Sequence, residues 1–481
     1  MDFRPYVEDT SASGPEQPAQ AESKTQVDSI DELHQDVVSQ FPFLNGYSHI
    51  VFLFQPDADT SRETIIATVH AALAKLTAQV PWLAGQVLHN PGPPGNSGHY
   101  MLAPWPLNAH KNDMVRVEDC EDRMPPIAQI VRAGAPISML DAKILTPFPS
   151  LPLPHGLEPP LPVMLLQVNF LRGGVIINLS THHMAVDGNG IVQIMRLLAT
   201  VLQGQEIAAA DREQANRDRR RVVPLIPRGE PVKDHSHLRA PPGHITVPPS
   251  SPPKWCYFKL PVSALPTLKK LASPPSQQQQ LSENDVICAL CWQRITAIRL
   301  ARGFSPDTMT KMTRIIDARA ALGVPITYMG HLTYYAVAQL PMRLVASLPL
   351  SSIAQTLRRE LNAANTTWAI RSYATFLARE PDKSRLAYAG LRNLDTDLGT
   401  TAFTASQSTS HDDGSAIPED FGPVLGHLRY TRRPNCSPLV GGITICPVES
   451  GAIPIVMCLP GADLEGLEKD REWRRYARYI G

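Results

Sequence analysis

The sequence predicts an α/β protein of two domains, and three observations support this. The 481 residues are enough for two large domains. β-branched apolar runs alternate with amphipathic helical segments along the chain, which favours a mixed architecture. The apolar periodicity then stops, and charges followed by prolines accumulate, as is typical of a connector. We expect a loose N-terminal segment over 1–30, a first domain over 31–205, a Pro-rich crossover over 206–255 and a second domain over 256–481.

In the first half, local patterns predict a strand, a helix, a hairpin and a second helix. Period-2 and continuous apolar runs indicate the strands, and apolar residues at helical spacing indicate the helices. Gly204 follows the second helix, where a left-handed C-terminal cap is expected. The predicted elements are the strand 47–54, the helix 65–80, the hairpin strands 163–170 and 175–179, and the helix 191–202.

The second half begins after the crossover, where prolines exclude a helix or a central strand. Ser282 is the expected N-cap of a long helix, with Asp285 three positions on. A charged segment predicts a closing helix. The predicted elements are the strand 255–260, the helix 282–300, the strands 312–316, 332–340, 443–446 and 453–459, and the helix 462–479.

Composition excludes several classes of function. The 45 Lys and Arg residues balance 45 Asp and Glu residues, so the chain lacks the positive charge that binds nucleic acid or anionic membrane. No apolar run approaches the ~18 residues of a membrane helix, and the first 30 residues are too polar for a signal peptide. Seven scattered cysteines fit a reduced compartment. We expect a cytoplasmic monomer that binds neither nucleic acid nor membrane.

The strongest chemical signal is His182-His183-x-x-x-Asp187-Gly188, between a predicted strand and a predicted helix. Loops at strand ends commonly carry catalytic side chains. An imidazole with a pKa of about 6.5 is largely neutral in the cytosol and can accept a proton from a hydroxyl. Asp187 could hold this loop rigid through an ion pair. The spacing alone favours a buried structural histidine, but the paired histidines and the strand–loop–helix setting favour a general base.

Other motifs favour structural interpretations. The run after Asp187 imitates a dinucleotide fingerprint, but Gln193 replaces its third glycine. His235 and His237 lie in the Pro-rich crossover, where a solvated loop is favoured over a metal site. Cys288 and Cys291 lie on an apolar helix, so we expect core residues and no redox pair. The sequence has neither a Walker lysine loop nor a nucleophile elbow.

A second segment, Asp420-Phe421-Gly422, indicates only a turn when it is taken alone. Together with the histidine motif, it resembles the BAHD acyltransferase superfamily, most closely the fungal branch that includes trichothecene 3-O-acetyltransferases. Within a third matching block, His331 stands where the family usually has asparagine. The further segments that line up with the family are 73–85, 282–294, 316–331 and 441–459.

The resemblance implies two chloramphenicol-acetyltransferase-like domains joined by a long crossover loop, with the active-site channel at their interface. It implies acyl-CoA as co-substrate, with acetyl-CoA expected, and a small hydroxylated acceptor, a fungal secondary metabolite; no bound cofactor or metal is implied. His183 would be the general base, and Asp187 would orient the loop by pairing with Arg319. Gly188 and the segment Asp420, Phe421, Gly422 would shape the channel.

Two departures from the family pattern, Pro423 and His331, keep alternatives open. Pro423 has no N–H to donate, so Thr404 or Ser406 could instead support the oxyanion through a hydroxyl. One alternative is a condensation-type enzyme, which shares the histidine motif but takes its acyl group from a carrier protein. The other is a ligand-binding member of the family that has lost transfer.

Overall fold

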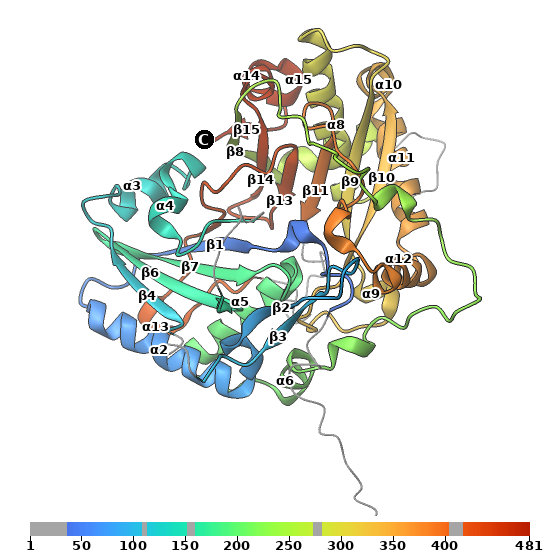
Figure 1. The fold of residues 1–481 in the computed structure, drawn as a ribbon. Helices are drawn as coiled ribbons and strands as arrows, with labels where there is room; N and C mark the ends of the chain where they lie inside the picture. Colours follow the sequence, from blue (N-terminus) through green and yellow to red (C-terminus); the bar gives the residue numbers. More distant parts are fainter. Residues whose placement is uncertain (1–35, 108–112, 152–158, 273–280, 404–416) are drawn as a thin grey trace, which may run out of the picture.

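The computed structural model describes residues 36–107, 113–151, 159–272, 281–403 and 417–481. Helices and strands alternate along this part of the chain, and the strands form three β-sheets (Figure 1). The predicted α/β class is therefore confirmed. Two large sheets dominate the structure, one with five strands and one with seven. The candidate site lies where these two sheets meet.

The five-stranded sheet is built mainly from the first half of the chain. Its strands are β1 (Tyr47–Phe54), β4 (Val115–Asp119), β6 (Met164–Leu171), β7 (Gly174–His182) and β12 (Tyr430–Arg432). Their order is β12-β1-β7-β6-β4, and only β4 and β6 run parallel. β1 pairs with β7 along its whole length, from Tyr47 opposite His182 to Phe54 opposite Val175. The predicted strand and hairpin are therefore confirmed.

Both faces of this sheet are covered, which explains why its strands are almost continuously apolar. One face packs on α2 (Arg62–Gln79) and α5 (Gly188–Leu202), both of which were predicted. The other face packs on α3 (Ile127–Arg132) and α4 (Ala142–Leu145). Figure 1 shows α2 and the α3–α4 pair on opposite sides of the sheet.

The seven-stranded sheet is built from the second half of the chain. Its order is β10 (Thr333–Pro341), β9 (Met309–Asp317), β11 (Leu398–Ala402), β13 (Gly442–Ile445), β14 (Ala452–Pro460), β8 (Pro253–Pro261) and β15 (Arg478–Tyr479). Only the pairs β9–β11 and β11–β13 are parallel. The helices packed with it are α7 (Leu265–Ala272), α8 (Glu283–Ala301), α10 (Met342–Ser347), α11 (Leu350–Ala364) and α14 (Gly461–Lys469). The predicted capping box of Ser282 and Asp285 starts α8.

Three predictions about elements were wrong. The crossover contains a short helix, α6 (Ala209–Ala215), because its prolines begin only after this charged segment. A central strand, β8, begins within the crossover at Pro253, because its pairing with β14 continues beyond the apolar run, with Lys254 opposite Leu459 and Pro253 opposite Pro460. The closing helix is two helices, α14 and α15 (Arg471–Arg474), because Asp470 ends the first and caps the second by accepting the N–H of Trp473.

The remaining elements lie around the two large sheets. A three-stranded sheet combines β2 (Gln86–Asn90), β3 (His99–Ala103) and β5 (Leu161–Pro162). The other helices are α9 (Arg319–Leu322), α12 (Thr367–Arg379) and α13 (Gly422–Leu425). The predicted loose segment 1–30 lies outside the described residues. No described helix is both long and apolar enough to cross a membrane.

Strand β12 joins the two halves of the chain in one sheet. It comes from the second half but pairs antiparallel with β1, with Phe52 opposite Thr431. Residues of the two halves therefore share a backbone hydrogen-bond ladder at the edge next to the cavity. The predicted division at the crossover did not include a strand from the second half in the first sheet.

Candidate active site

The histidine motif forms the connection between β7 and α5. His182 ends β7 and is fully buried, with its ring edge-on to Tyr47 at a centroid distance of 5.2 Å. Burial lowers the pKa of His182 to about 3, so this imidazole stays neutral. It packs in the core and does not line the cavity. The first histidine of the motif is therefore part of the packing of the fold.

His183 turns the other way and lines a large cavity. Its Nδ1 lies 2.8 Å from the carbonyl oxygen of Val186, three residues on in the same loop. A carbonyl can only accept, so we assign the ring proton to Nδ1, which leaves Nε2 with a free lone pair. Burial lowers the pKa of His183, partly opposed by the Val186 hydrogen bond and by the charge of Asp187. The imidazole is therefore neutral and able to accept a proton near pH 7.

Asp187 fixes the end of this loop. Its two carboxylate oxygens accept bidentate hydrogen bonds from Arg319, at 2.9 and 3.0 Å. It also caps α5 by accepting the N–H of Gly190 at 2.8 Å, and it accepts the N–H of Leu332 at 2.9 Å. Burial raises the pKa of Asp187, but the charge and hydrogen bonds of Arg319 outweigh this, and the net pKa is lowered. The side chain is an ionised carboxylate.

Arg319 connects the loop to the other half of the chain. Besides Asp187, it donates to the carbonyl oxygens of Tyr328 at 3.0 Å and Gly330 at 2.7 Å, and to Asp317 at 2.9 Å. The guanidinium is almost fully buried, so this pair is a rigid tie between α5 and the β9–β10 connection. The hydrogen bond of His183 goes to Val186 and not to Asp187, so the carboxylate does not relay its proton.

Two glycines at the start of α5, Gly188 and Gly190, are required by close packing. A Cβ on Gly190 would lie far inside van der Waals contact with the carbonyl oxygen of Met329. A Cβ on Gly188 would overlap the ring of Phe403. Both contacts come from the second half of the chain, so the glycines let the two halves approach at the base of the cavity.

Replacing Gly190 by alanine should therefore destabilise the protein. Met329 contributes backbone, which cannot rotate away, so we expect a loss of about 1–3 kcal/mol in the free energy of unfolding. Urea denaturation followed by circular dichroism measures this. Gly399→Ala is the matched control, because a Cβ there has its nearest neighbour at 3.9 Å and should change stability little. Equal stability of the two variants would contradict this account.

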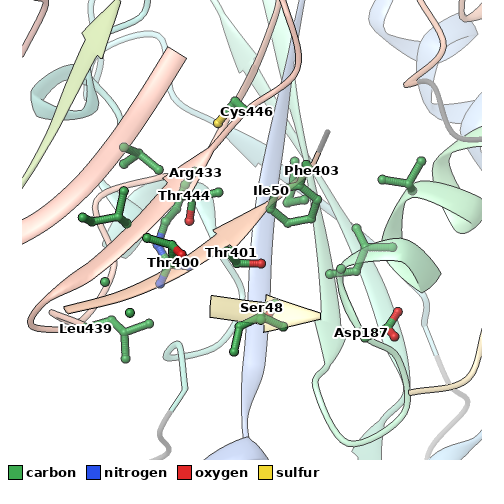
Figure 2. Close-up of a pocket in the computed structure, with 18 of the residues that line it drawn as sticks. Ser48, Ile50, Asp187, Thr400, Thr401, Phe403, Arg433, Leu439, Thr444 and Cys446 are labelled. Atoms are coloured by element: carbon green, nitrogen blue, oxygen red, sulfur yellow. The ribbon is translucent and has the colours of Figure 1, made fainter. Parts of the chain in front are cut away.

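The cavity lies between the two large sheets and has a volume of about 1970 Å³. Figure 2 shows side chains from both halves on its walls. Ser48 and Ile50 come from β1, and Thr401 and Thr444 come from β11 and β13. This volume is well above the range of about 300–1,000 Å³ typical of single-ligand pockets. The space is sufficient for two substrates at once.

A second histidine stands next to the first. The rings of His331 and His183 are 5.6 Å apart between centroids and inclined at 61°. Burial lowers the pKa of His331 to about 3, so it is uncharged. Its Nδ1 has no hydrogen-bond partner among the described residues. The position that departs from the family pattern thus adds a second neutral imidazole to the cavity wall.

Comparison with known proteins decides the family. A model of the trichothecene 3-O-acetyltransferase-like N-terminal domain matches residues 47–201. A model of the Transferase family matches residues 128–473, more than half of the chain. The chain belongs to the Transferase family, the BAHD acyltransferases. It is therefore an acyltransferase, and the family resemblance seen in the sequence is confirmed.

Fungal relatives of this BAHD acyltransferase match nearly end to end. O-acyltransferase pigD of Monascus ruber is 39% identical over 461 residues, covering 93% of this chain and 98% of the relative. O-acetyltransferase SAT5 of Stachybotrys chartarum is 40% identical over 456 residues, covering 93% and 96%. The crystal structure of Fusarium sporotrichioides TRI101 with coenzyme A and T-2 superposes with a TM-score of 0.83 at 29% identity, covering 93% and 99%.

In this acyltransferase, the Asp-Phe-Gly segment supports the far end of α5. The carbonyl of Asp420 accepts the side-chain amide of Gln203 at 2.8 Å, and Phe421 packs on Phe52 and Phe54. Gly422 has a φ of +83°, and a Cβ there would overlap the backbone of Leu202. The segment thus holds the helix whose other end carries the histidine loop.

Pro423 has a local explanation in the same segment. It stands in the first turn of α13, where the backbone N–H has no partner within the helix and proline costs nothing. Thr404 and Ser406, the two hydroxyls considered for the oxyanion, lie outside the described residues. No group for that role is therefore assigned.

The remaining sequence motifs are structural in the BAHD acyltransferase. Cys288 and Cys291 are buried in the core around α8, and burial raises the pKa of both thiols. The expectation of a solvated loop was wrong for His235, which is buried against Tyr373 and Phe376, whereas His237 is exposed. Within the described ranges, no cluster of three or more His, Cys, Asp or Glu side chains could hold a metal ion.

A buried network near the motif was missed by the sequence analysis. Arg219, in the crossover, donates to Asp36 at 2.7 Å and to the carbonyl of Ala185 at 2.6 Å. Asp36 also accepts the hydroxyl of Tyr328 at 3.0 Å. The crossover thereby holds the histidine loop from behind. The only signal in the sequence was the basic run 217–221, whose other arginines are more exposed.

Proposed function

We propose that this protein transfers an acyl group, acetyl in the simplest case, from acyl-CoA to a hydroxyl of a small fungal secondary metabolite, with His183 as the general base. The observation that carries this is the free Nε2 of a neutral His183 on the wall of a two-substrate cavity. Support comes from the TRI101 crystals, which hold coenzyme A with T-2 or deoxynivalenol.

The proposed reaction needs one proton acceptor. Nε2 of His183 takes the proton of the acceptor hydroxyl as its oxygen attacks the thioester carbonyl. The tetrahedral intermediate then collapses with loss of the CoA thiolate, and the imidazolium returns the proton to it. The Val186 carbonyl keeps the ring oriented through both transfers, and Asp187 with Arg319 acts as a positioning pair that holds the loop. No acyl-enzyme forms.

The organisation of the chain is part of this proposal. The domains would span 31–205 and 256–481, joined by the crossover 206–255, with the substrate channel between them. The two large sheets on either side of the cavity support this division. Asp420, Phe421, Gly422 and Gly188 would shape the channel through packing, and the protein would act as a cytoplasmic monomer.

The direct test is release of free thiol. The purified protein is mixed with acetyl-CoA and a panel of hydroxylated aromatic and terpenoid metabolites, and CoA is measured with a thiol reagent. We expect thiol release that depends on the acceptor. A preference for a carrier-protein thioester over acetyl-CoA would instead identify a condensation-type enzyme. Binding of CoA without turnover across donors and acceptors would identify a member that has lost transfer.

The rate should depend on pH in a defined direction. Because burial lowers the pKa of His183 below the usual imidazole value of about 6.5, the neutral base persists below that pH. We expect kcat/KM for acetyl transfer to stay level from pH 8 down through 6.5 and to fall only in more acidic solution. Initial rates in buffers of constant ionic strength measure this. A fall centred above pH 7 would contradict the assignment of the base.

A further inference from the structure

The cavity wall carries a cation that has no acidic partner among the described residues. Arg433 follows β12 and lines the cavity. Its guanidinium lies 4.4 Å from the ring centroid of Trp255, and its backbone N–H donates to the hydroxyl of Tyr257 at 2.7 Å. Its side chain makes no ion pair or hydrogen bond within the described ranges, and its Nε is buried without a partner.

The neighbouring arginine shows what a structural guanidinium does in this protein. Arg432 is buried, forms a bidentate pair with Glu449, and donates to the carbonyl oxygens of Gly134 and Ala135. Arg433 has the opposite environment, because stacking on Trp255 positions the planar group without neutralising its charge. Arg433 is partly buried, but its Nε is fully buried and has no partner among the described residues, which indicates that a ligand supplies the acceptor.

Two hydroxyls lie on the same wall. Thr401 of β11 and Thr444 of β13 are paired in a parallel register, so their side chains share one face of the sheet. Both are partly exposed to the cavity, and neither hydroxyl has a hydrogen-bond partner within the described part of the chain. Figure 2 shows Arg433, Thr401 and Thr444 on one side of the pocket and Asp187 across from them.

The position of Arg433 limits which ligand group it can meet. It lines the same cavity as His183, and Figure 2 shows it across the pocket from Asp187, at the end of the histidine loop. The phosphates of CoA are separated from the thioester by the whole pantetheine arm. A group that meets Arg433 therefore belongs to the acceptor or to the acyl chain. A planar guanidinium with flanking hydroxyls matches a carboxylate.

We propose that Arg433, together with the hydroxyls of Thr401 and Thr444, binds a carboxylate carried by one of the two substrates. The inference rests on the proposed transferase function and adds a substrate class to it: hydroxy acids as acceptors, or dicarboxylic monothioesters as donors. Arg433 is thus a specificity-determining residue, distinct from the base.

The experiment uses matched probes and variants of the full chain. Isothermal titration calorimetry compares 4-(hydroxymethyl)benzoate with its methyl ester, and malonyl-CoA with acetyl-CoA. The variants are Arg433→Met, Arg433→Lys and, as control, Arg343→Met, which removes an exposed arginine paired with Asp307. Thermal unfolding confirms that each variant is folded. Thiol release is then measured with the same four compounds.

We expect the wild type to bind one carboxylate probe at least about tenfold more tightly than its neutral match. Arg433→Met should abolish that ratio, Arg433→Lys should retain part of it, and the control should leave it unchanged. Preference for the benzoate assigns the subsite to the acceptor, and preference for malonyl-CoA assigns it to the acyl group. Equal affinities within both pairs, or an equal loss for charged and neutral probes, would overturn the proposal.

Because binding is measured without turnover, the two hypotheses fail separately. Absence of thiol release with every acceptor, including the metabolite panel, would overturn the transferase function. The affinity ratio between the carboxylate probe and its neutral match would still test the carboxylate subsite. Normal thiol release with no carboxylate preference would overturn the subsite alone.

Discussion

The variant His183→Ala should lose about 10²–10⁴-fold in kcat for acyl transfer, the range expected for removal of a general base. Nε2 of His183 is the free proton acceptor on the cavity side of the loop, while Nδ1 is held by Val186. The adjacent His331 is neutral but has a pKa of only about 3, so it is too weak a base to replace it. Initial-rate thiol release with acetyl-CoA gives kcat and KM separately.

Folding and CoA binding should survive this substitution, because the ring lies at the cavity surface. The matched control is His70→Ala, an exposed histidine on α2, which should keep wild-type kinetics. Calorimetric titration with CoA and thermal unfolding test the two requirements. Unchanged kcat in His183→Ala would refute the assigned base, whereas loss of CoA binding would assign the histidine to the donor site.

The second large effect concerns stability. Asp187→Ala should lower the free energy of unfolding by about 3–5 kcal/mol, because it leaves Arg319 buried without its bidentate partner. The same change removes the cap of α5 and the acceptor for the N–H of Leu332. Urea denaturation monitored by tryptophan fluorescence measures this loss of stability. A variant that is expressed only as insoluble protein would agree with the larger values of this range.

Two variants show whether burial of the pair causes this loss. Asp307→Ala removes an ion pair that is exposed on both sides and should cost less than about 1 kcal/mol. Asp187→Asn keeps an oxygen for the Gly190 cap but loses the charge, so it should fall between the two alanine variants. A loss at Asp187 no larger than that at Asp307 would contradict the role of the buried tie.

Much of the fold could be predicted because its signals are local. The apolar pattern of each segment predicted β1, the β6–β7 hairpin, α5 and α8. Ser282 and Asp285 predicted the N-terminal cap of α8. β12 could not be found this way, since three residues become a strand only by pairing with β1 from the other half. The break between α14 and α15 depends on one side chain, Asp470, within a segment where acidic and basic residues alternate and no other residue marks a helix end.

The candidate site divides in the same manner. The sequence motif and family pattern pointed to His183, Asp187 and Arg319, and the structure brings the last two into contact. Arg433 belongs to no sequence motif. What distinguishes it is that its side chain has no acidic partner among the described residues, and only the folded structure shows this. The sequence showed that His331 departs from the family pattern, but it could not show that the ring lies next to His183.

The strand exchange at β12 limits how members of this family could recombine. A hybrid that joined two relatives at the crossover would lay β12 of one parent on β1 of the other. It would also pack Phe421 of one parent on Phe52 and Phe54 of the other. The segment 421–432 should therefore come from the same parent as β1, although it follows the crossover in the sequence. Shuffled libraries that keep this segment with β1 should yield more folded hybrids than libraries cut at the crossover alone.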